Sequence, residues 1–269
     1  MSHALRIRGR VVVSPACEEV GWAERRVIDP NLSTTARETL AAAWLRTACD
    51  HHASVPAYAK IALNLVTLGA PRELLEACHR ASLDEIDLAR RAFSLASVYV
   101  GRAFGPGPIE ALLRPERDPR DPAALLRRLV LETLEDGCLG EALGAELARE
   151  GLLLAFDEDV KLTLGAITHV SAAHAELAWR IVYWCCTAGD RALRAAVRAK
   201  VDELPRMNMP MRVDARIAGE LYRHGVVAPE RKRQLFVEIR QDLVARALRI
   251  LDGFDARGTR YAPLSLVDA

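Results

Sequence analysis

Apolar residues recur at steps of three and four over four long stretches of the chain, which is the spacing of amphipathic helices. The stretches cover residues 35–69, 71–101, 121–152 and 157–188. The first begins with a capping box, Thr35-x-x-Glu38, and the second begins at Pro71, since proline is favourable in a first turn. The short link between these two stretches predicts antiparallel neighbours. The pattern therefore predicts four long helices that pack as a bundle.

The rest of the chain follows other patterns. Alternating side chains at 5–13 predict a short strand or hairpin, and the Gly- and Pro-rich stretch 104–122 predicts a crossing loop rather than an element. Three shorter helices are expected: one from Asp190, one ending near Arg223 and one over 229–252. We therefore expect an all-α protein with a long crossover. Its parts are an N-terminal β or irregular segment (1–33) that packs on the bundle, the four-helix bundle (34–189) and a C-terminal helical extension of the same domain (190–269).

Composition narrows the class of protein. The 269 residues are 51% hydrophobic and 27% charged, with a formal net charge of +1. This balance suits a large buried core and excludes disordered, collagen-like and polybasic nucleic-acid-binding proteins. No run approaches the ~18 uninterrupted apolar residues of a membrane span, and residues 1–10 lack the apolar core of a leader. We expect a cytoplasmic protein without nucleic-acid or membrane partners, and six cysteines without a CxxC pair favour reduced, structural thiols.

Each of the four predicted helices carries one ionisable residue on its otherwise apolar stripe. These residues are His51, Glu85, Glu141 and His174. All four lie near the middle of their helices, so an antiparallel bundle would bring them to a similar depth. A buried carboxylate is costly alone, but two carboxylates and two imidazoles offset that cost by binding a divalent metal or by hydrogen-bonding to one another. We therefore expect these side chains to converge.

Segments around these residues resemble the helix cores of bacterial ferritin-like domain proteins. The segments are His52-Ala-Ser-Val, Leu83-Asp-Glu-Ile-x-x-Ala89, Glu135-Asp-Gly-Cys-Leu-Gly-Glu141 and His174-Ala-Glu-Leu-Ala-Trp179. The Gly-Pro-Gly-Pro run at 105–108 and the closing helix after Pro229 fit the same family. The resemblance covers the chain from about residue 35 onward. It implies a ferritin-like four-helix bundle whose typical members hold two irons or manganeses, with Glu on helices one and three and Glu-x-x-His on helices two and four.

The ligand set that this resemblance implies is incomplete in the chain. His51 stands in place of the first-helix Glu, Leu88 in place of the second-helix His, and Ser171 in place of the fourth-helix Glu. The family's residue types are kept at Glu85, Glu141 and His174. These three would hold one Fe or Mn, or a remodelled pair, with His51 as a ligand or a base.

Other residues lie beside the stripes as partners of the ligands or as the lining of a pocket. They are His52, Asp50, Tyr58, Tyr99, Trp44, Ser171 and His169. Pro56 removes a hydrogen bond inside the first helix, so we expect a kink that opens a pocket beside the site. His3 is expected to be disordered, and His224 to be solvated or to cap a helix.

The resemblance and the retained residues imply a metal-dependent oxidoreductase, of oxidase or oxygenase type, that acts with dioxygen on a small organic substrate. Fe or Mn is the expected cofactor, and His51 and Glu85 are the candidate catalytic residues. The alternative is a metal-free bundle that serves as a binding or scaffold protein, or as a non-redox acid–base enzyme using the same two residues. A homodimer stays open as the oligomeric form.

Overall fold

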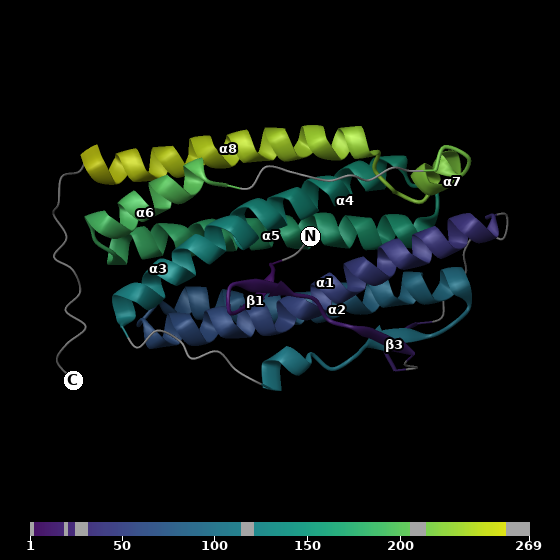
Figure 1. The fold of residues 1–269 in the computed structure, drawn as a ribbon, viewed down its shortest axis with the longest axis horizontal. Helices are drawn as coiled ribbons and strands as arrows, with labels where there is room; N and C mark the ends of the chain where they lie inside the picture. The colour runs from purple at the N-terminus through teal and green to yellow at the C-terminus, as the bar shows by residue number, and fades with distance from the viewer. Residues whose placement is uncertain (1–2, 19–20, 25–31, 114–120, 205–213, 257–269) are drawn as a thin grey trace.

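The computed structural model describes residues 3–18, 21–24, 32–113, 121–204 and 214–256. Four long helical segments form its body (Figure 1). They are α1 (Thr34–Thr67), α2 (Arg72–Val100), the continuous run of α3 (Pro122–Glu132), η2 (Thr133–Glu141) and α4 (Ala142–Leu154), and α5 (Glu158–Ala188). The predicted all-α class is confirmed, and each segment lies within a few residues of its expected position.

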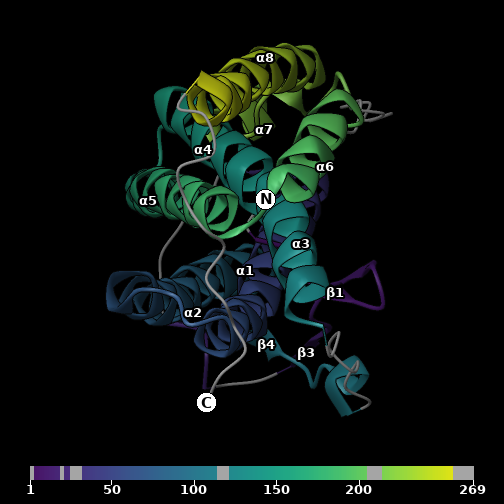
Figure 2. The same cartoon turned by 90° about the vertical axis from the view of Figure 1, so that its left-hand side faces the viewer.

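The four segments associate as two pairs. Helix α1 packs along α2, and α5 packs along α4 and η2. Contacts of α2 with α5, and of α1 with α3, join the two pairs. Figure 2 shows the α1–α2 pair below and the pair formed by α4 and α5 above it. This stacking brings the centres of all four segments toward one another.

Short polar signals fix the ends of these helices. The N-cap of α1 is Ser33, whose hydroxyl accepts a hydrogen bond from the Ala36 amide, so the expected cap at Thr35 is wrong by two residues. Asp157 caps α5 by accepting from the Val160 amide. Gly101 ends α2 with a φ of 68°, a left-handed conformation that favours glycine.

The third segment departs from the uniform helix that its pattern predicts. Its central part, Thr133–Glu141, is a π-helix, and such stretches often lie at functional sites. Gly137 lies inside it, and a Cβ built there would stand 2.6 Å from the Cβ of Ala178 on α5. The absence of a side chain at Gly137 therefore allows α5 to approach the π-helix closely.

Two small antiparallel sheets lie against α1 and α2. Strands β1 (Leu5–Ile7) and β2 (Arg10–Val12) form the predicted hairpin, and its turn residues Arg8 and Gly9 both have positive φ. Strand β3 (Ala16–Glu18) pairs with β4 (Phe104–Pro106). The expectation of a plain crossing loop after α2 is thus wrong, because this stretch contains β4 and a short 3₁₀ helix, η1 (Glu110–Leu113).

A C-terminal layer covers the α4 side of the bundle (Figures 1 and 2). It consists of α6 (Arg191–Asp202), α7 (Ala218–Arg223) and α8 (Pro229–Ala256). Helix α8 packs on α4, η2 and α6. Within the described residues, no helix is both long enough and apolar enough to cross a bilayer.

The hydrophobic core is divided into two large clusters. On α1, one cluster includes buried residues up to Cys49, and the other includes buried residues from Tyr58 onward. On α2 the division falls between Ala81 and Leu88, and on α5 between Ile167 and Leu177. His51, Glu85 and His174 fall in these three gaps. Buried polar residues therefore lie where the two clusters meet.

Candidate metal centre

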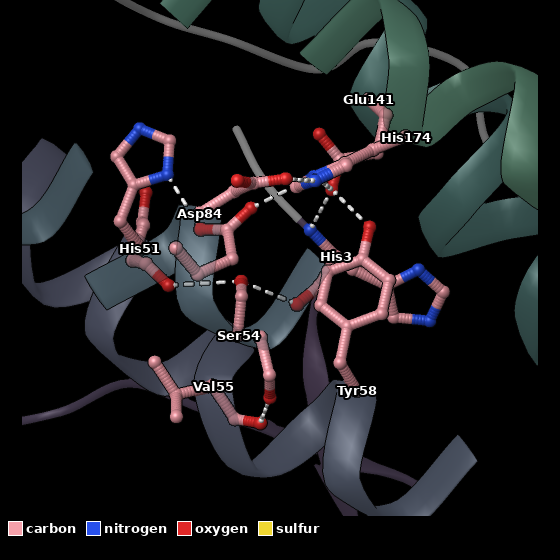
Figure 3. A network of polar contacts seen from close by, with 11 residues as sticks. His3, His51, Ser54, Val55, Tyr58, Asp84, Glu141 and His174 are labelled. Atoms are coloured by element: carbon pink, nitrogen blue, oxygen red, sulfur yellow. Dashed lines mark hydrogen bonds and ion pairs between the residues drawn. The ribbon is translucent and has the colours of Figure 1, made fainter. Parts of the chain in front are cut away.

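Three of the four predicted residues meet in this polar layer. The side chains of Glu85 and Glu141 are fully buried, and His174 is 3% exposed. Each offers a ligand atom that lies within 4.8 Å of a ligand atom of the other two. They come from three different elements, α2, the end of η2 and α5, so the tertiary fold assembles the group (Figure 3).

His51 joins this group through Glu85. Its Nδ1 lies 2.7 Å from Glu85 Oε2, and its ring is 2% exposed. An ionised carboxylate only accepts, so His51 Nδ1–H donates this bond. His51 is not one of the three residues whose ligand atoms are mutually close. The structure therefore places it as a neighbour that fixes the orientation of Glu85.

Two of the candidate ligands have one atom held and one atom without a hydrogen bond. Glu85 Oε2 is held by His51, whereas Oε1 has no hydrogen-bond partner among the described residues. His174 Nε2 lies 3.3 Å from Asp84 Oδ2, so Nε2–H donates to this carboxylate. His174 Nδ1 lies 3.2 Å from Glu85 Oε1 but lacks the alignment of a hydrogen bond. A proton held at Nε2 leaves the lone pair of the neutral ring on Nδ1, toward the carboxylates.

Glu141 shows the same division between its two oxygens. Its Oε1 accepts from the Tyr58 hydroxyl at 3.0 Å and from the His3 backbone N–H at 2.8 Å. Its Oε2 is buried without a hydrogen-bond partner. Figure 3 shows Tyr58 and the backbone of His3 approaching Glu141 together. Both outer contacts fix the carboxylate and leave one oxygen unpartnered.

This donor set fits a divalent metal ion. A buried polar atom without a hydrogen bond costs free energy, and each of the three residues has one among the described residues: Glu85 Oε1, Glu141 Oε2 and His174 Nδ1. The Glu141 oxygen that lies 3.8 Å from His174 Nδ1 is the held atom, Oε1. Two carboxylates with one imidazole are ligands typical of Fe(II) and Mn(II). The outer contacts of each ligand match those that usually orient metal-binding side chains.

The negative and positive charges of these residues also compensate one another. Burial opposes the charge on Glu85, but the positive charge and the hydrogen bond of His51, together with the close approach of the His174 ring, outweigh it and lower its pKa to about 2. Burial likewise disfavours the charged form of His174, yet its contacts with Glu141 and Glu85 raise its pKa to about 10. A negative Glu85 thus lies against a positive His174 when both ring nitrogens carry protons.

The structure places some of the other expected residues at the site and others elsewhere. Tyr58 is at the site, and burial, followed by the charge of Glu141, raises the pKa of its hydroxyl well above the usual value. Ser171 is fully buried, and its hydroxyl has no hydrogen-bond partner. Asp50 directly precedes His51 and is half-buried, and burial raises its pKa. Its backbone carbonyl, rather than its carboxylate, contacts Ser54.

Four expected partners have other surroundings. His52 Nδ1 lies 2.8 Å from the Ser14 hydroxyl, so this ring contacts the N-terminal segment. The Tyr99 hydroxyl lies 2.8 Å from His224 Nδ1, and Trp44 packs with Tyr99 in one apolar cluster. His169 is exposed. Position beside a stripe did not distinguish these side chains from Tyr58, because a small rotation about a helix axis changes the neighbour that a long side chain reaches.

Three further expectations concern residues around the site. The disorder expected of His3 is wrong, since its side chain is only 4% exposed. His224 is buried rather than solvated, but it is the C-cap of α7, which confirms the capping alternative. Helix α1 runs unbroken through Pro56, and the Val55 carbonyl accepts from the Ser82 hydroxyl. A cavity of about 20 Å³ lies on the next turn, with Ala57 in its lining. It is far smaller than a substrate pocket.

Two contacts of the site were missed in the sequence. Asp84 was identified only as part of a motif, although its place next to Glu85 on a helix was a usable signal. The contact of His3 with Glu141 joins residues 138 positions apart, and no local pattern indicates it.

The family models, the curated proteins and the solved structures compared with this chain gave no match. The argument on function therefore depends on the site itself.

Proposed function

We propose that the protein binds one divalent Fe or Mn ion through Glu85, Glu141 and His174 and acts as an oxidoreductase on a small organic substrate with dioxygen. The observation that carries this proposal is the convergence of three buried residues, each of which has one polar atom held by a neighbour and one atom without a hydrogen bond among the described residues. The ferritin-like resemblance of the helix cores supports the same chemistry. In this view the bundle is a divergent ferritin-like domain.

A bound Fe or Mn ion would supply redox chemistry and Lewis acidity at positions that the three ligands leave open. The chain's own residues would do the rest. Asp84 holds the proton of His174 at Nε2, so Nδ1 stays free to bind. His51 holds Glu85 Oε2, and this contact also places a proton donor or acceptor next to the centre. Tyr58 and the His3 amide keep Glu141 in place.

Burial limits the size of what can react here. The three candidate ligands and His51 are at most 3% exposed, and the small cavity nearby measures about 20 Å³. A water molecule or dioxygen fits such a space, but an organic substrate requires the protein to open. Water is otherwise kept from the centre by the two apolar clusters that flank it.

Metal analysis of matched variants tests this function. We expect protein produced with added iron or manganese, and purified without chelator, to carry about one equivalent of one of these metals. Glu141→Gln and His174→Ala should lose it, because each removes one ligand. Glu146→Gln, on a half-exposed glutamate of α4 outside the site, should retain it. Oxygen uptake by the Fe(II)-loaded protein, compared with Glu141→Gln, then tests the redox part.

A metal-free function is the second candidate, and the charge balance favours it. The raised pKa of His174 and the lowered pKa of Glu85 show that the cluster is compensated by its own ion pairs. Such a bundle would serve as a binding or scaffold protein, or His51 and Glu85 would act in acid–base chemistry. Protein that takes up neither metal under either growth condition would reject the first proposal and support this one.

A further inference from the structure

One wall of the site is not helical. The segment His3–Ile7, which includes β1 and which we call the strap, lies against α1 and η2 where Glu141 is held. The His3 amide donates to Glu141 Oε1, and the His3 ring packs against Tyr58 with 5.2 Å between ring centroids. Figure 3 shows His3 reaching the centre beside Tyr58. The strap therefore both covers a candidate ligand and positions it.

Polar bonds tie the strap to the helices. The Ser54 hydroxyl donates to the His3 carbonyl at 2.6 Å, and Lys60 Nζ donates to the Arg6 carbonyl at 3.1 Å. The Arg6 guanidinium bonds both carboxylate oxygens of Asp136 and also contacts Glu135. The two carboxylates lie on the π-helix that ends at Glu141. Strap and π-helix are thus fastened to each other just before the candidate ligand.

A small cavity lies beneath the strap. The 20 Å³ cavity is lined by strap residues His3 and Arg6 and by Thr133 and Asp136 of the π-helix. Two buried polar atoms of its lining residues, His3 Nδ1 and Thr133 Oγ1, have no hydrogen-bond partner within the part of the chain that the structure describes. Leu5 packs with Ala53 in a small apolar cluster separate from the two large ones. Apart from the contact of the His3 ring with Tyr58, the strap therefore packs outside the two large clusters.

We infer that the strap is a removable cover of the metal centre, and that metal ions enter and leave when it detaches from Ser54 and the π-helix. This inference rests on the proposed function. Detachment withdraws the His3 amide from Glu141 Oε1, so the ligand is loosened in the same event that opens the wall. A protein with a weakened strap should therefore lose its metal faster.

Ser54→Ala is the main test, because it removes an anchor of the strap with little change in volume. Its matched control is Ser97→Ala: Ser97 is also a buried helix serine that contacts the carbonyl four residues earlier and holds the backbone of a strand, here the Phe104 amide of β4. A second variant, Arg6→Lys, keeps the positive charge but loses the bidentate contact with Asp136. Arg10→Lys, on an exposed arginine of β2, is its control.

Two measurements give the outcome. In Mn-loaded protein we expect transfer of metal to excess chelator to be about five-fold faster in Ser54→Ala and Arg6→Lys, the factor that one lost hydrogen bond produces, and unchanged in both controls. In metal-free protein, amide hydrogen exchange of residues 5–7 should rise in the same two variants. Wild-type protein that binds metal and releases it no more slowly than Ser54→Ala would overturn the inference. If the wild type takes up no metal, the proposed function fails. Unchanged amide hydrogen exchange of residues 5–7 in Ser54→Ala would then also reject the strap as a detachable cover.

Discussion

At the scale of single residues, the site depends on how each ligand is held. Glu85, Glu141 and His174 were predictable because each is an ionisable side chain on an apolar helical stripe. Their outer partners were harder to predict. The Asp84 side chain lies on the partly exposed face of α2 and is itself 48% exposed, so nothing about its position indicates a contact with a buried residue. Local sequence can thus show which polar group is out of place, but not which neighbour compensates it.

The contact between Asp84 and His174 leads to a direct prediction. Asp84→Ala removes the acceptor of the Nε2–H bond, so the ring can place its proton on Nδ1 or rotate away from the centre. We expect Mn(II) affinity to fall by about 10–100-fold, the range found for such outer partners. Titration of the metal-free protein with Mn(II) measures it. The control is Asp87→Ala, because Asp87 lies three residues further along α2 and contacts Arg91. This variant should leave the Mn(II) affinity unchanged, and an equal loss of affinity would contradict the argument.

At the scale of elements, the π-helix is the largest difference from the sequence-based prediction. Apolar spacing indicates a helix over 121–152 but does not distinguish π from α geometry across nine residues. The pairing of β3 with β4 was equally hidden, because each strand has only three residues. Helix ends were more predictable, since caps such as Asp157 and Gly101 act within one turn.

Gly137 tests how tightly the π-helix meets α5. Gly137→Ala would place its Cβ against Ala178, and we expect the free energy of unfolding to fall by about 1–3 kcal/mol, the range for overpacking. Gly165→Ala on α5 is the control, since a Cβ there would meet only Leu152 at 4.0 Å. The control should gain up to about 1 kcal/mol from helix propensity. Urea denaturation of both variants measures the difference, and equal stabilities would contradict the close approach.

The lowered pKa of Glu135 predicts how the ion pairs between the π-helix and its neighbours respond to acid. Burial disfavours its charged form, but the hydrogen bond from Lys200 and the charge of Arg6 outweigh it, so its pKa is lowered. A carboxyl with a lowered folded-state pKa stabilises the fold above its unfolded-state pKa, and this contribution is lost as pH falls through the folded value. Glu135→Gln should therefore reduce the free energy of unfolding near neutral pH by up to about 1 kcal/mol. Denaturation repeated in acid should show the two proteins converging, and a pH-independent difference would exclude the ion pairs as its cause.

At the scale of the whole molecule, a polar layer lies between two apolar clusters, with one ionisable residue from each long helical segment in or beside it. The sequence predicted this depth because the four residues lie near the middle of their helices. It could not predict that the strap closes the layer, since that wall depends on contacts between distant parts of the chain. Polar bonds between the helices are concentrated in this layer.

A metal bound in this layer would tie α2, η2 and α5 together, so folding and metal binding should be coupled. Mn(II) at about 100 times its dissociation constant should add about 2.7 kcal/mol to the free energy of unfolding, provided that the unfolded chain does not bind it. The melting temperature should rise with metal concentration in the wild type and stay constant in Glu141→Gln, which keeps the shape of the side chain but loses a charged ligand. Mg(II) serves as the control ion, because it binds a site containing imidazole poorly. Equal shifts in the wild type and in Glu141→Gln would place any bound metal elsewhere on the protein.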